Sequence, residues 1–317
     1  MSRRLIAPLA LVTLSILSLF VGVTEIGTGD VLRDPEARAL MLTSRLPRLF
    51  AVLITGASLA IAGAIMQMLV RNRFVEPMTV GTGQGAALGV LIVTIAAPGA
   101  PLLVQMTLAA ATAFGTSLGF LAIAHRMPPS QPFLVALVGL IYGGIIGAGV
   151  TFVAYQADLL QYIDIWTNGE FSGILQGRYE TLWLAAAVAG LAYLAADQFS
   201  ILGMGRTVSI GLGLNYGQVM LFGLAAVSLV SAMTVTIVGM IPFVGLVVPN
   251  IVSRIMGDDL RRTLPQIALS GAVLVLGADI LARVLRAPYE MPVGTVLGIM
   301  GAALFLWLLY RPAPRVR

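Results

Sequence analysis

Runs of about 20 apolar residues recur along the 317-residue chain and constrain its fold more than any other feature. A run of this length crosses the roughly 30 Å hydrocarbon core of a bilayer as an α-helix. Hydrophobic residues make up 58% of the chain and charged residues 10%, whereas soluble domains carry about 25% charged residues. So few charges cannot cover a soluble surface. The sequence therefore predicts an all-α polytopic membrane protein and excludes a soluble enzyme.

Ten such runs are assigned as spans within a single domain, residues 1–317. The first is longer than the apolar region of a cleavable signal peptide, so we expect it to be retained. The eighth is short and contains Pro249, which is typical of a half-span buried among other helices. The 35 glycines gather inside the spans and favour close helix packing. The predicted spans are Leu5–Thr24, Leu46–Val70, Val80–Ala97, Leu102–Ala124, Phe133–Tyr155, Thr181–Ala196, Tyr216–Gly239, Phe243–Met256, Leu264–Leu285 and Val293–Tyr310.

Three segments between spans are not expected to cross the bilayer. Residues 158–177 contain Tyr162 and Trp166, which suit an interfacial helix on the outer side. Residues 199–215 are apolar but interrupted by glycines, so we expect one or two short helices at the cytoplasmic surface. Residues 257–263 are predicted to form a compact charged cytoplasmic turn.

The arginines predict the orientation of the spans, since loops rich in basic residues stay in the cytoplasm. All 19 basic residues are arginines. With the N-terminus inside, twelve face the cytoplasm and seven face outward, which favours two cytoplasmic termini. The cytoplasmic set is Arg3, Arg4, Arg71, Arg73, Arg126, Arg206, Arg254, Arg261, Arg262, Arg311, Arg315 and Arg317, and the outer set is Arg33, Arg38, Arg45, Arg48, Arg178, Arg283 and Arg286.

Several residue types are missing, and their absence from the sequence excludes whole classes of site. Without lysine the chain has no conventional Walker A loop. Without cysteine and with His125 as the one histidine, it has no thiolate site and no multi-histidine metal centre. The net charge of +5 does not indicate nucleic-acid binding, because the arginines stand mostly singly between apolar runs. We expect no catalytic residue, no metal and no cofactor of its own.

Eight short motifs follow one another along nearly the whole chain and carry a family resemblance. Together they resemble the FecCD family, the permease subunits of iron–siderophore ABC importers, which also includes the cobalamin permease. The motifs are Arg45-Leu-Pro-Arg48, Gly63-Ala-Ile-Met-Gln67, Asn72-Arg-Phe-Val-Glu-Pro77, Phe243-Val-Gly-Leu-Val-Val-Pro-Asn250, Gly257-Asp-Asp-Leu-Arg-Arg262, Leu264-Pro265, Ala278-Asp-Ile-Leu-Ala-Arg283 and Glu290-Met-Pro-Val-Gly294.

The resemblance implies a type II ABC importer permease fold in a bacterial inner membrane. It implies a pore formed with a second permease, identical or related, two cytoplasmic ATPases that bind the ATP, and an extracytoplasmic siderophore-binding protein. Arg73, Asn250 and the turn Asp258–Arg261 depart from the cobalamin-type pattern. They resemble a siderophore subgroup that includes permeases for catecholate-type and related ferric chelates. Cobalamin or haem is the alternative cargo.

Three arginines near the outer ends of spans match positions that, in this family, meet acidic residues of the docked binding protein. Arg45 and Arg48 lie three residues apart, so they face one side of a helical turn. Arg283 lies near the outer end of the ninth span. Guanidinium groups suit carboxylates and steer encounter. The alternative is that these side chains anchor at lipid headgroups.

Asp279 lies within a span, and an intramembrane acid is a candidate for proton transfer. Arg283 follows four residues later on the same helix, which favours a structural ion pair instead. The sequence offers no second buried acid for a relay. An ion-coupled secondary transporter therefore remains only a distant alternative, and a membrane-embedded enzyme lacks clustered His, Asp or Glu.

Residues 200–214 match the family's coupling element, which sits in a cleft of the ATPase. Arg206 is the one charged residue of this segment. The alternative is an amphipathic helix lying on lipid. The predicted coupling residues are Ser200, Leu202, Gly203, Gly205, Arg206, Ser209, Gly211 and Leu212.

Residues at the cytoplasmic end of the second span are candidates for the transport pathway. By the same resemblance, Asn72 and Phe74 match positions that narrow the cytoplasmic end of the pore. Met66 and Gln67 on the span itself are candidates for facing the pathway. Ordinary helix packing is the alternative for each of them.

Overall fold

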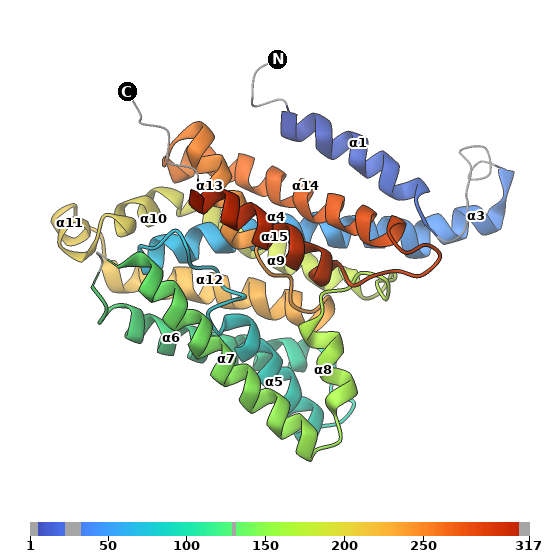
Figure 1. The fold of residues 1–317 in the computed structure, drawn as a ribbon, viewed down its shortest axis with the longest axis horizontal. Coiled ribbons are helices and arrows are strands. Elements are labelled where there is room, and N and C mark those ends of the chain that lie inside the picture. Colours follow the sequence, from blue (N-terminus) through green and yellow to red (C-terminus); the bar gives the residue numbers. More distant parts are fainter. Residues whose placement is uncertain (1–5, 23–32, 129–130, 311–317) are drawn as a thin grey trace.

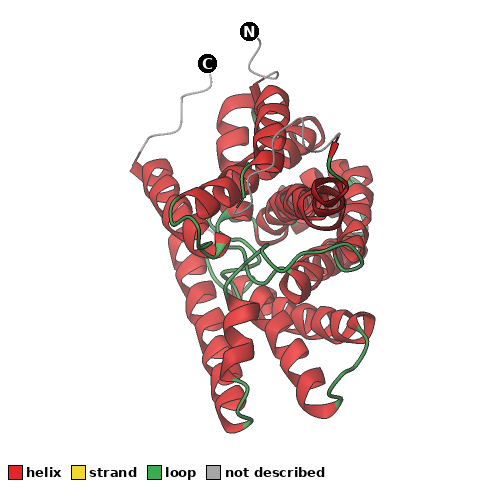
Figure 2. Ribbon diagram, turned by 90° about the vertical axis from the view of Figure 1, so that its right-hand side faces the viewer, coloured by secondary structure: helices red, strands yellow, loops and turns green. Residues whose placement is uncertain are grey.

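The computed structural model describes residues 6–22, 33–128 and 131–310, and this part of the chain is helical and contains no strand. Most helices run roughly along the long axis of the molecule (Figure 1). Viewed from one end of that axis, the helices surround a group of loops turned towards the viewer (Figure 2). The all-α prediction is confirmed. The predicted cytoplasmic arginines Arg3, Arg4, Arg311, Arg315 and Arg317 lie outside the described residues.

The helices follow the predicted spans with small shifts at their ends. They are α1 (Ile6–Phe20), α3 (Pro35–Leu40), a π-helical turn (Met41–Arg45), α4 (Leu46–Val70), α5 (Thr82–Ala96), α6 (Leu102–Ala124), α7 (Pro132–Gln156), α8 (Leu160–Thr167), a 3-10 turn (Tyr179–Thr181), α9 (Leu182–Leu194), α10 (Ala196–Gly203), α11 (Arg206–Gly211), α12 (Tyr216–Ile237), α13 (Val244–Met256), α14 (Leu260–Val284) and α15 (Val293–Tyr310).

Each predicted span coincides with an apolar helix, but the helices differ in reach. Among the described residues, five are long and apolar enough to cross a membrane: Pro35–Val70, α6, α7, α12 and α14. A sixth crossing arises if Tyr179–Leu194 and α10, bent by 64° at their junction, form one span. The remaining apolar helices, α1, α5, α13 and α15, are shorter.

The first turn of α14 corrects the sequence prediction at residues 257–263. Asp259 is the N-cap of α14, and its side chain accepts a hydrogen bond from the backbone N–H of Arg262. Such a cap satisfies a donor that the helix leaves free. The helix therefore begins at Leu260, and the charged segment is the start of a helix rather than a separate turn.

Helix α4 is the central element of the bundle and is buried along most of its length. It packs against α14, α13 and α12. Glycines permit this approach: a Cβ on Gly63 would lie 2.2 Å from the carbonyl oxygen of Gly245 in α13, and one on Gly56 would lie 2.5 Å from that of Gly271 in α14. Small residues let backbones meet where lipid supplies little hydrophobic driving force.

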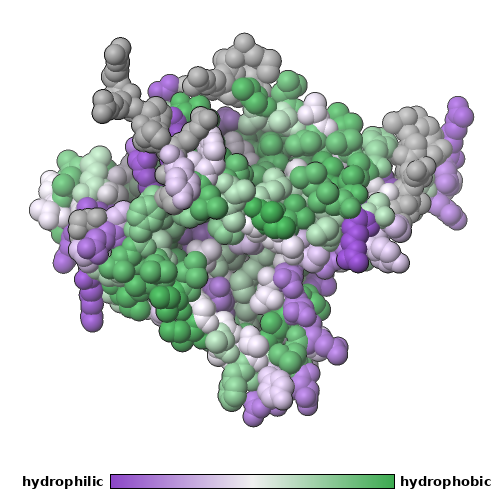
Figure 3. All heavy atoms as spheres, viewed as in Figure 1, coloured by the Kyte–Doolittle hydropathy of each residue, from purple (hydrophilic) through white to green (hydrophobic). Residues whose placement is uncertain are grey.

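The surface of the bundle carries large apolar side chains, especially on α7, where Ile145 is 67% exposed and Phe152 is 65% exposed. Hydrophobic residues cover broad areas between the two ends of the long axis, and hydrophilic residues gather mainly at the extremities (Figure 3). This distribution fits a bundle surrounded by acyl chains and by other membrane helices.

The predicted interfacial segment contains a short helix, α8, but only one of its two aromatic residues faces outward. Tyr162 is 51% exposed, as expected. Trp166 is 8% exposed, and its carbonyl accepts a hydrogen bond from the N–H of Met240. Trp166 was therefore wrongly predicted as an interfacial side chain, because it packs into the core.

Candidate functional site

Four charged side chains form a cluster where α4 and α14 meet, near the end of the molecule that carries α3. Arg48 on α4 donates two hydrogen bonds to Asp279 of α14, at 2.8 and 3.1 Å. It donates two more to Glu290, in the loop before α15, at 2.8 and 3.0 Å. Arg283 pairs with the other oxygen of Asp279 at 2.6 Å. Asp279 thus binds two arginines, and its side chain is 0% exposed.

Arg283 also holds the end of α1. Its guanidinium donates to the carbonyls of Ser18, at 2.9 Å, and Val21, at 2.7 Å, and to the Oγ of Ser18 at 2.6 Å. A buried charge is tolerated when it is paired and its donors are satisfied. Asp279 and Arg283 form the predicted ion pair, and together with Arg48 they join α1, α4 and α14.

The predicted docking arginines all bond within this chain. Arg283 is 7% exposed, so its guanidinium does not lie on the outer surface, as docking would require. Arg48 is saturated by two carboxylates, and its side chain is 13% exposed. Arg45 is half-buried and donates to the carbonyl of Leu19. Sequence spacing could not reveal partners that lie far away in the chain.

Glu76 is a buried acid that the sequence analysis missed. It is 1% exposed and accepts hydrogen bonds from the N–H groups of Phe243, at 2.7 Å, and Leu246, at 3.1 Å. These donors belong to the first turn of α13, where a negative charge is favourable. The expectation of no second buried acid is therefore wrong. The one available signal was its position just before Pro77 in the motif Asn72–Pro77.

Glu76 does not complete a proton relay with Asp279. Each acid has its own set of donors. Glu76 accepts hydrogen bonds from backbone N–H groups, and Asp279 pairs with two arginines. Both contacts hold helices together. The described residues therefore give the ion-coupled alternative no chain of acids to use.

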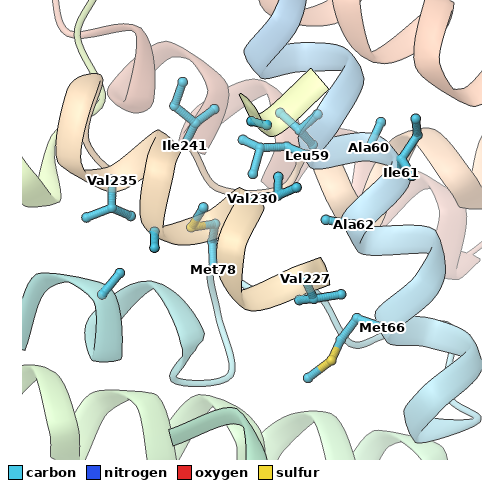
Figure 4. Packing of buried hydrophobic residues seen from close by; sticks show 14 of the residues in the cluster. Leu59, Ala60, Ile61, Ala62, Met66, Met78, Val227, Val230, Val235 and Ile241 are labelled. Carbon is cyan, nitrogen blue, oxygen red and sulfur yellow. The ribbon is translucent and has the colours of Figure 1, made fainter. Parts of the chain in front are cut away.

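Two of the four candidate pathway residues are tied into the bundle. Met66 is 0% exposed and lies in the core beside α12 (Figure 4), which favours ordinary helix packing. Phe74 stacks on Phe133, with ring centroids 4.6 Å apart. The contact fixes the loop after α4 against the start of α7.

Gln67 and Asn72 are largely buried, but they border a cavity of about 740 Å³. Gln67 donates to the carbonyl of Gly245 at 3.1 Å. Asn72 donates to the carbonyl of Pro132 at 2.7 Å and accepts from the N–H of Phe74 at 2.9 Å. The cavity also reaches Ser200, Gly203 and Asp258. It therefore joins the end of α4 to the predicted coupling segment.

The predicted coupling segment forms two short helices, α10 and α11, that meet at an elbow. Gly205 has φ of 101° and makes the turn between them. Ser209 is 0% exposed, and its hydroxyl donates to the carbonyls of Gly205, at 2.8 Å, and Ile201, at 2.9 Å. Leu202 is 0% exposed and fixes α10 to the core. The side of α11 that carries Arg206, Gly211 and Leu212 is exposed.

The described residues contain no group of three or more His, Asp or Glu side chains that could hold a metal ion. Apolar helices of spanning length and an exposed two-helix elbow define a polytopic helical membrane protein. The chain belongs to the FecCD transport family, whose model matches residues 10–311.

Curated relatives match nearly the whole chain. The petrobactin import system permease protein YclN of Bacillus subtilis is 42% identical over 303 residues, which are 95% of this chain and 96% of that protein. The ferric-anguibactin transport system permease protein FatD of Vibrio anguillarum is 40% identical over 306 residues, 96% of this chain and 98% of that protein. The hemin transport system permease protein HmuU of Yersinia pestis is 34% identical over 281 residues, 86% and 83% of the two chains.

A solved structure has the same fold. It is an inward-facing conformation of a metal-chelate type ABC transporter, with a TM-score of 0.82 and 24% sequence identity. The match covers 97% of this chain and 98% of that one. The predicted type II ABC importer permease fold is therefore confirmed.

Proposed function

We propose that this chain is the membrane-spanning permease subunit of an ABC importer that carries a ferric siderophore inward. The observation that carries the proposal is the full-length relatedness to the petrobactin and anguibactin permeases, at 42% and 40% identity. Both of those relatives are more similar to this chain than the hemin permease, at 34%. A siderophore of the catecholate type or a related ferric chelate is the preferred cargo, with haem as the second candidate.

The working assembly has two permeases around one pathway, two ATPases on the cytoplasmic side and a binding protein on the outer side. We assign the end with α10 and α11 to the cytoplasm. The arginine bias supports this orientation, since Arg71, Arg73, Arg126 and Arg206 lie at that end. ATP is bound by the ATPases, because the chain has no lysine for a phosphate loop.

The α10–α11 elbow is the proposed contact with the ATPase. Leu202 and Ser209 fix the elbow to the bundle from inside, while Arg206, Ile210 and Leu212 point outward. A knob of this kind transmits a displacement only if it is rigid. The hydrogen bond from the Ser209 hydroxyl to the carbonyl of Ile201 supplies that rigidity, because it joins α11 to α10.

Reconstitution into proteoliposomes with the cognate ATPase and binding protein tests the proposal. Uptake of ⁵⁵Fe-labelled petrobactin and anguibactin is compared with uptake of hemin and cobalamin. We expect ATP-dependent accumulation of at least one ferric siderophore and little uptake of cobalamin. Uptake restricted to hemin or cobalamin would refute the siderophore assignment, and uptake driven by an ion gradient without ATP would refute the importer class.

Two matched variants test the coupling role within the same assay. Ser209→Ala removes the hydroxyl that joins α10 to α11, and we expect ATP hydrolysis to continue while transport per ATP falls. Thr207→Ala, on an exposed position of the same helix, is the control and is expected to transport normally. Equal transport per ATP in both variants would contradict a role for the rigid elbow.

A further inference from the structure

A positively charged cavity of about 670 Å³ lies at the end of the bundle that we assign to the cytoplasm. It opens where α4 and α6 end and α12 begins, beside α11. Figure 1 shows these elements together at the left end of the molecule. The residues that line it are Arg71, His125, Arg206, Ile210, Leu214, Asn215, Tyr216, Gly217 and Met220.

Two arginines from different elements meet in this cavity. Arg71 follows α4 in a left-handed conformation, with φ of 56°, which directs the chain out of the helix. Its guanidinium lies against Gly205, where a Cβ would be 3.1 Å from Cζ and Nη1. Arg206 directly follows Gly205 in the chain. Tyr216, the first residue of α12, lines the same cavity as both arginines. A polar group placed beside Tyr216 would therefore feel two positive charges.

Neither arginine has an acidic partner inside this cavity, although Arg71 also borders the neighbouring cavity that Asp197, Asp258 and Asp259 line. No residue lining the positively charged cavity is acidic. Arg73 pairs with Asp258, and Arg261 pairs with Asp197, but neither Arg71 nor Arg206 forms a salt bridge with a described residue. Burial lowers the pKa of His125, and the charge of Arg71 adds to this, although a hydrogen bond with Leu69 raises it. His125 therefore adds a polar ring rather than a third cation near pH 7.

The cavity also has an apolar wall. Ile210 is 54% exposed, and Leu214 and Met220 line the cavity. Beyond Met220, the outer side of α12 continues with Leu221, 52% exposed, and Phe222, 42% exposed. The cavity thus presents cations at the level of the helix ends and apolar surface in the direction of the membrane. An anion that carries a hydrocarbon tail matches this arrangement.

We propose that this cavity binds the phosphate headgroup of an anionic phospholipid from the cytoplasmic leaflet. The guanidiniums of Arg71 and Arg206 bind phosphate oxygens, since Arg matches phosphate geometry. The Tyr216 hydroxyl is a further donor, and an acyl chain follows Met220 and the exposed side of α12. Basic pockets between membrane helices on this side of a bilayer are suited to such headgroups. The inference rests on the proposed function only for the orientation of the bundle.

Such a lipid would touch the proposed coupling element directly. Arg206 begins α11, and Gly205 forms the elbow. A phosphate held by Arg71 and Arg206 links the end of α4 to the start of α11 through one ligand. Loss of the lipid then loosens α11 without disturbing the core contacts of Leu202.

The test measures lipid binding to the purified permease–ATPase complex by native mass spectrometry, with phosphatidylglycerol titrated into zwitterionic detergent. The variants are Arg71→Gln, Arg206→Gln and the double variant. Arg126→Gln is the matched control, because this exposed arginine lies beside His125 but does not line the cavity. At about 1 kcal/mol per basic residue, each single variant should weaken phosphatidylglycerol binding about fivefold and the double variant about 25-fold. The control should bind like the unmodified complex.

Three further results separate the sources of the anion. Phosphatidylcholine should bind weakly and be insensitive to the substitutions. About 10 mM inorganic phosphate is well above the Kd expected of a specific anion site. If it displaces phosphatidylglycerol, the lipid proposal is overturned and the ligand of the cavity is free phosphate. Retained lipid binding in the double variant, together with loss of the ATPase from the complex, would overturn the proposal. It would indicate that the two arginines bind a carboxylate of the ATPase instead. Failure here leaves siderophore uptake by the unmodified assembly unaffected, so the two proposals fail separately.

Discussion

Replacing Asp279 with asparagine removes the charge that joins α1, α4 and α14. Asp279→Asn keeps the size of the side chain and leaves an amide in place of a carboxylate that binds Arg48 and Arg283. The amide cannot neutralise two guanidiniums. It also offers one acceptor oxygen where the carboxylate offered two. The substitution therefore tests whether the cluster contributes to the stability of the folded bundle.

The expected loss of unfolding free energy follows from the burial of the ion pair. The side chain of Asp279 is 0% exposed, and that of Arg283 is 5% exposed. Removing one partner of a buried ion pair costs about 3–5 kcal/mol. Arg48 keeps Glu290, and Arg283 keeps its contacts with Ser18 and Val21. We therefore expect the lower end, about 3 kcal/mol, which lowers the melting temperature of a 317-residue chain by about 4–5 °C.

The assay is differential scanning fluorimetry of tryptophan emission in detergent, with Asp258→Asn as the matched control. Asp258 pairs with Arg73 at 2.7 Å, much like the 2.8 Å pair of Asp279 with Arg48, but its side chain is 61% exposed. A surface pair contributes about 0–1 kcal/mol. The control should therefore melt close to the unmodified protein. Equal shifts in both variants would refute the argument from burial.

Three further predictions follow from single contacts. Gly63→Ala places a Cβ 2.2 Å from the Gly245 backbone and should cost about 1–3 kcal/mol of unfolding free energy. In the control Gly144→Ala, the new Cβ meets nothing within 4 Å. Equal melting temperatures of the two variants would contradict the close approach of α4 and α13. Glu76→Gln should cost about 1–2 kcal/mol, because the amide has one oxygen to accept from the N–H groups of Phe243 and Leu246, where the carboxyl group has two. Its control is Glu180→Gln, an exposed acceptor of the Gly177 N–H, and equal losses would argue against burial. Arg45→Glu should weaken binding-protein docking with normal membrane insertion, as a pull-down with the binding protein measures; unchanged docking and uptake would leave Arg45 as an anchor for α1.

The sequence predicted the positions of the apolar helices well because the signal is local. Every residue of a span contributes to a run whose length is set by the bilayer, so no long-range information is needed. The second span was predicted at Leu46–Val70, which are the bounds of α4. The ninth was placed four residues late, because Asp259 and the two arginines after Leu260 read as a polar turn. A hydropathy profile does not distinguish a charged first helical turn from a polar loop.

Side-chain partners were predicted poorly, because they depend on which helices meet. Asp279 and Arg283 are four residues apart, and their pairing follows from helical spacing alone. Arg48 and Asp279 are 231 residues apart, and no pattern in the sequence joins them. Met66 was a candidate for facing the pathway, with ordinary helix packing as the alternative. Helix α4 is instead covered on nearly all sides, and its composition gives no sign of that central position.

The position of α4 limits where an importer of this fold can move. Its close contacts with α13 and α14 bring backbones together at Gly63 and Gly56, and the cluster around Asp279 holds α14 at the far end. Packed interfaces of this kind shift between discrete arrangements rather than deform gradually. Among the described residues, no glycine near the 64° bend between α9 and α10 meets the backbone of another helix. We therefore expect displacement of the ATPases to rotate α10 and α11 together about this bend first, and the block of α4, α13 and α14 to follow as one body.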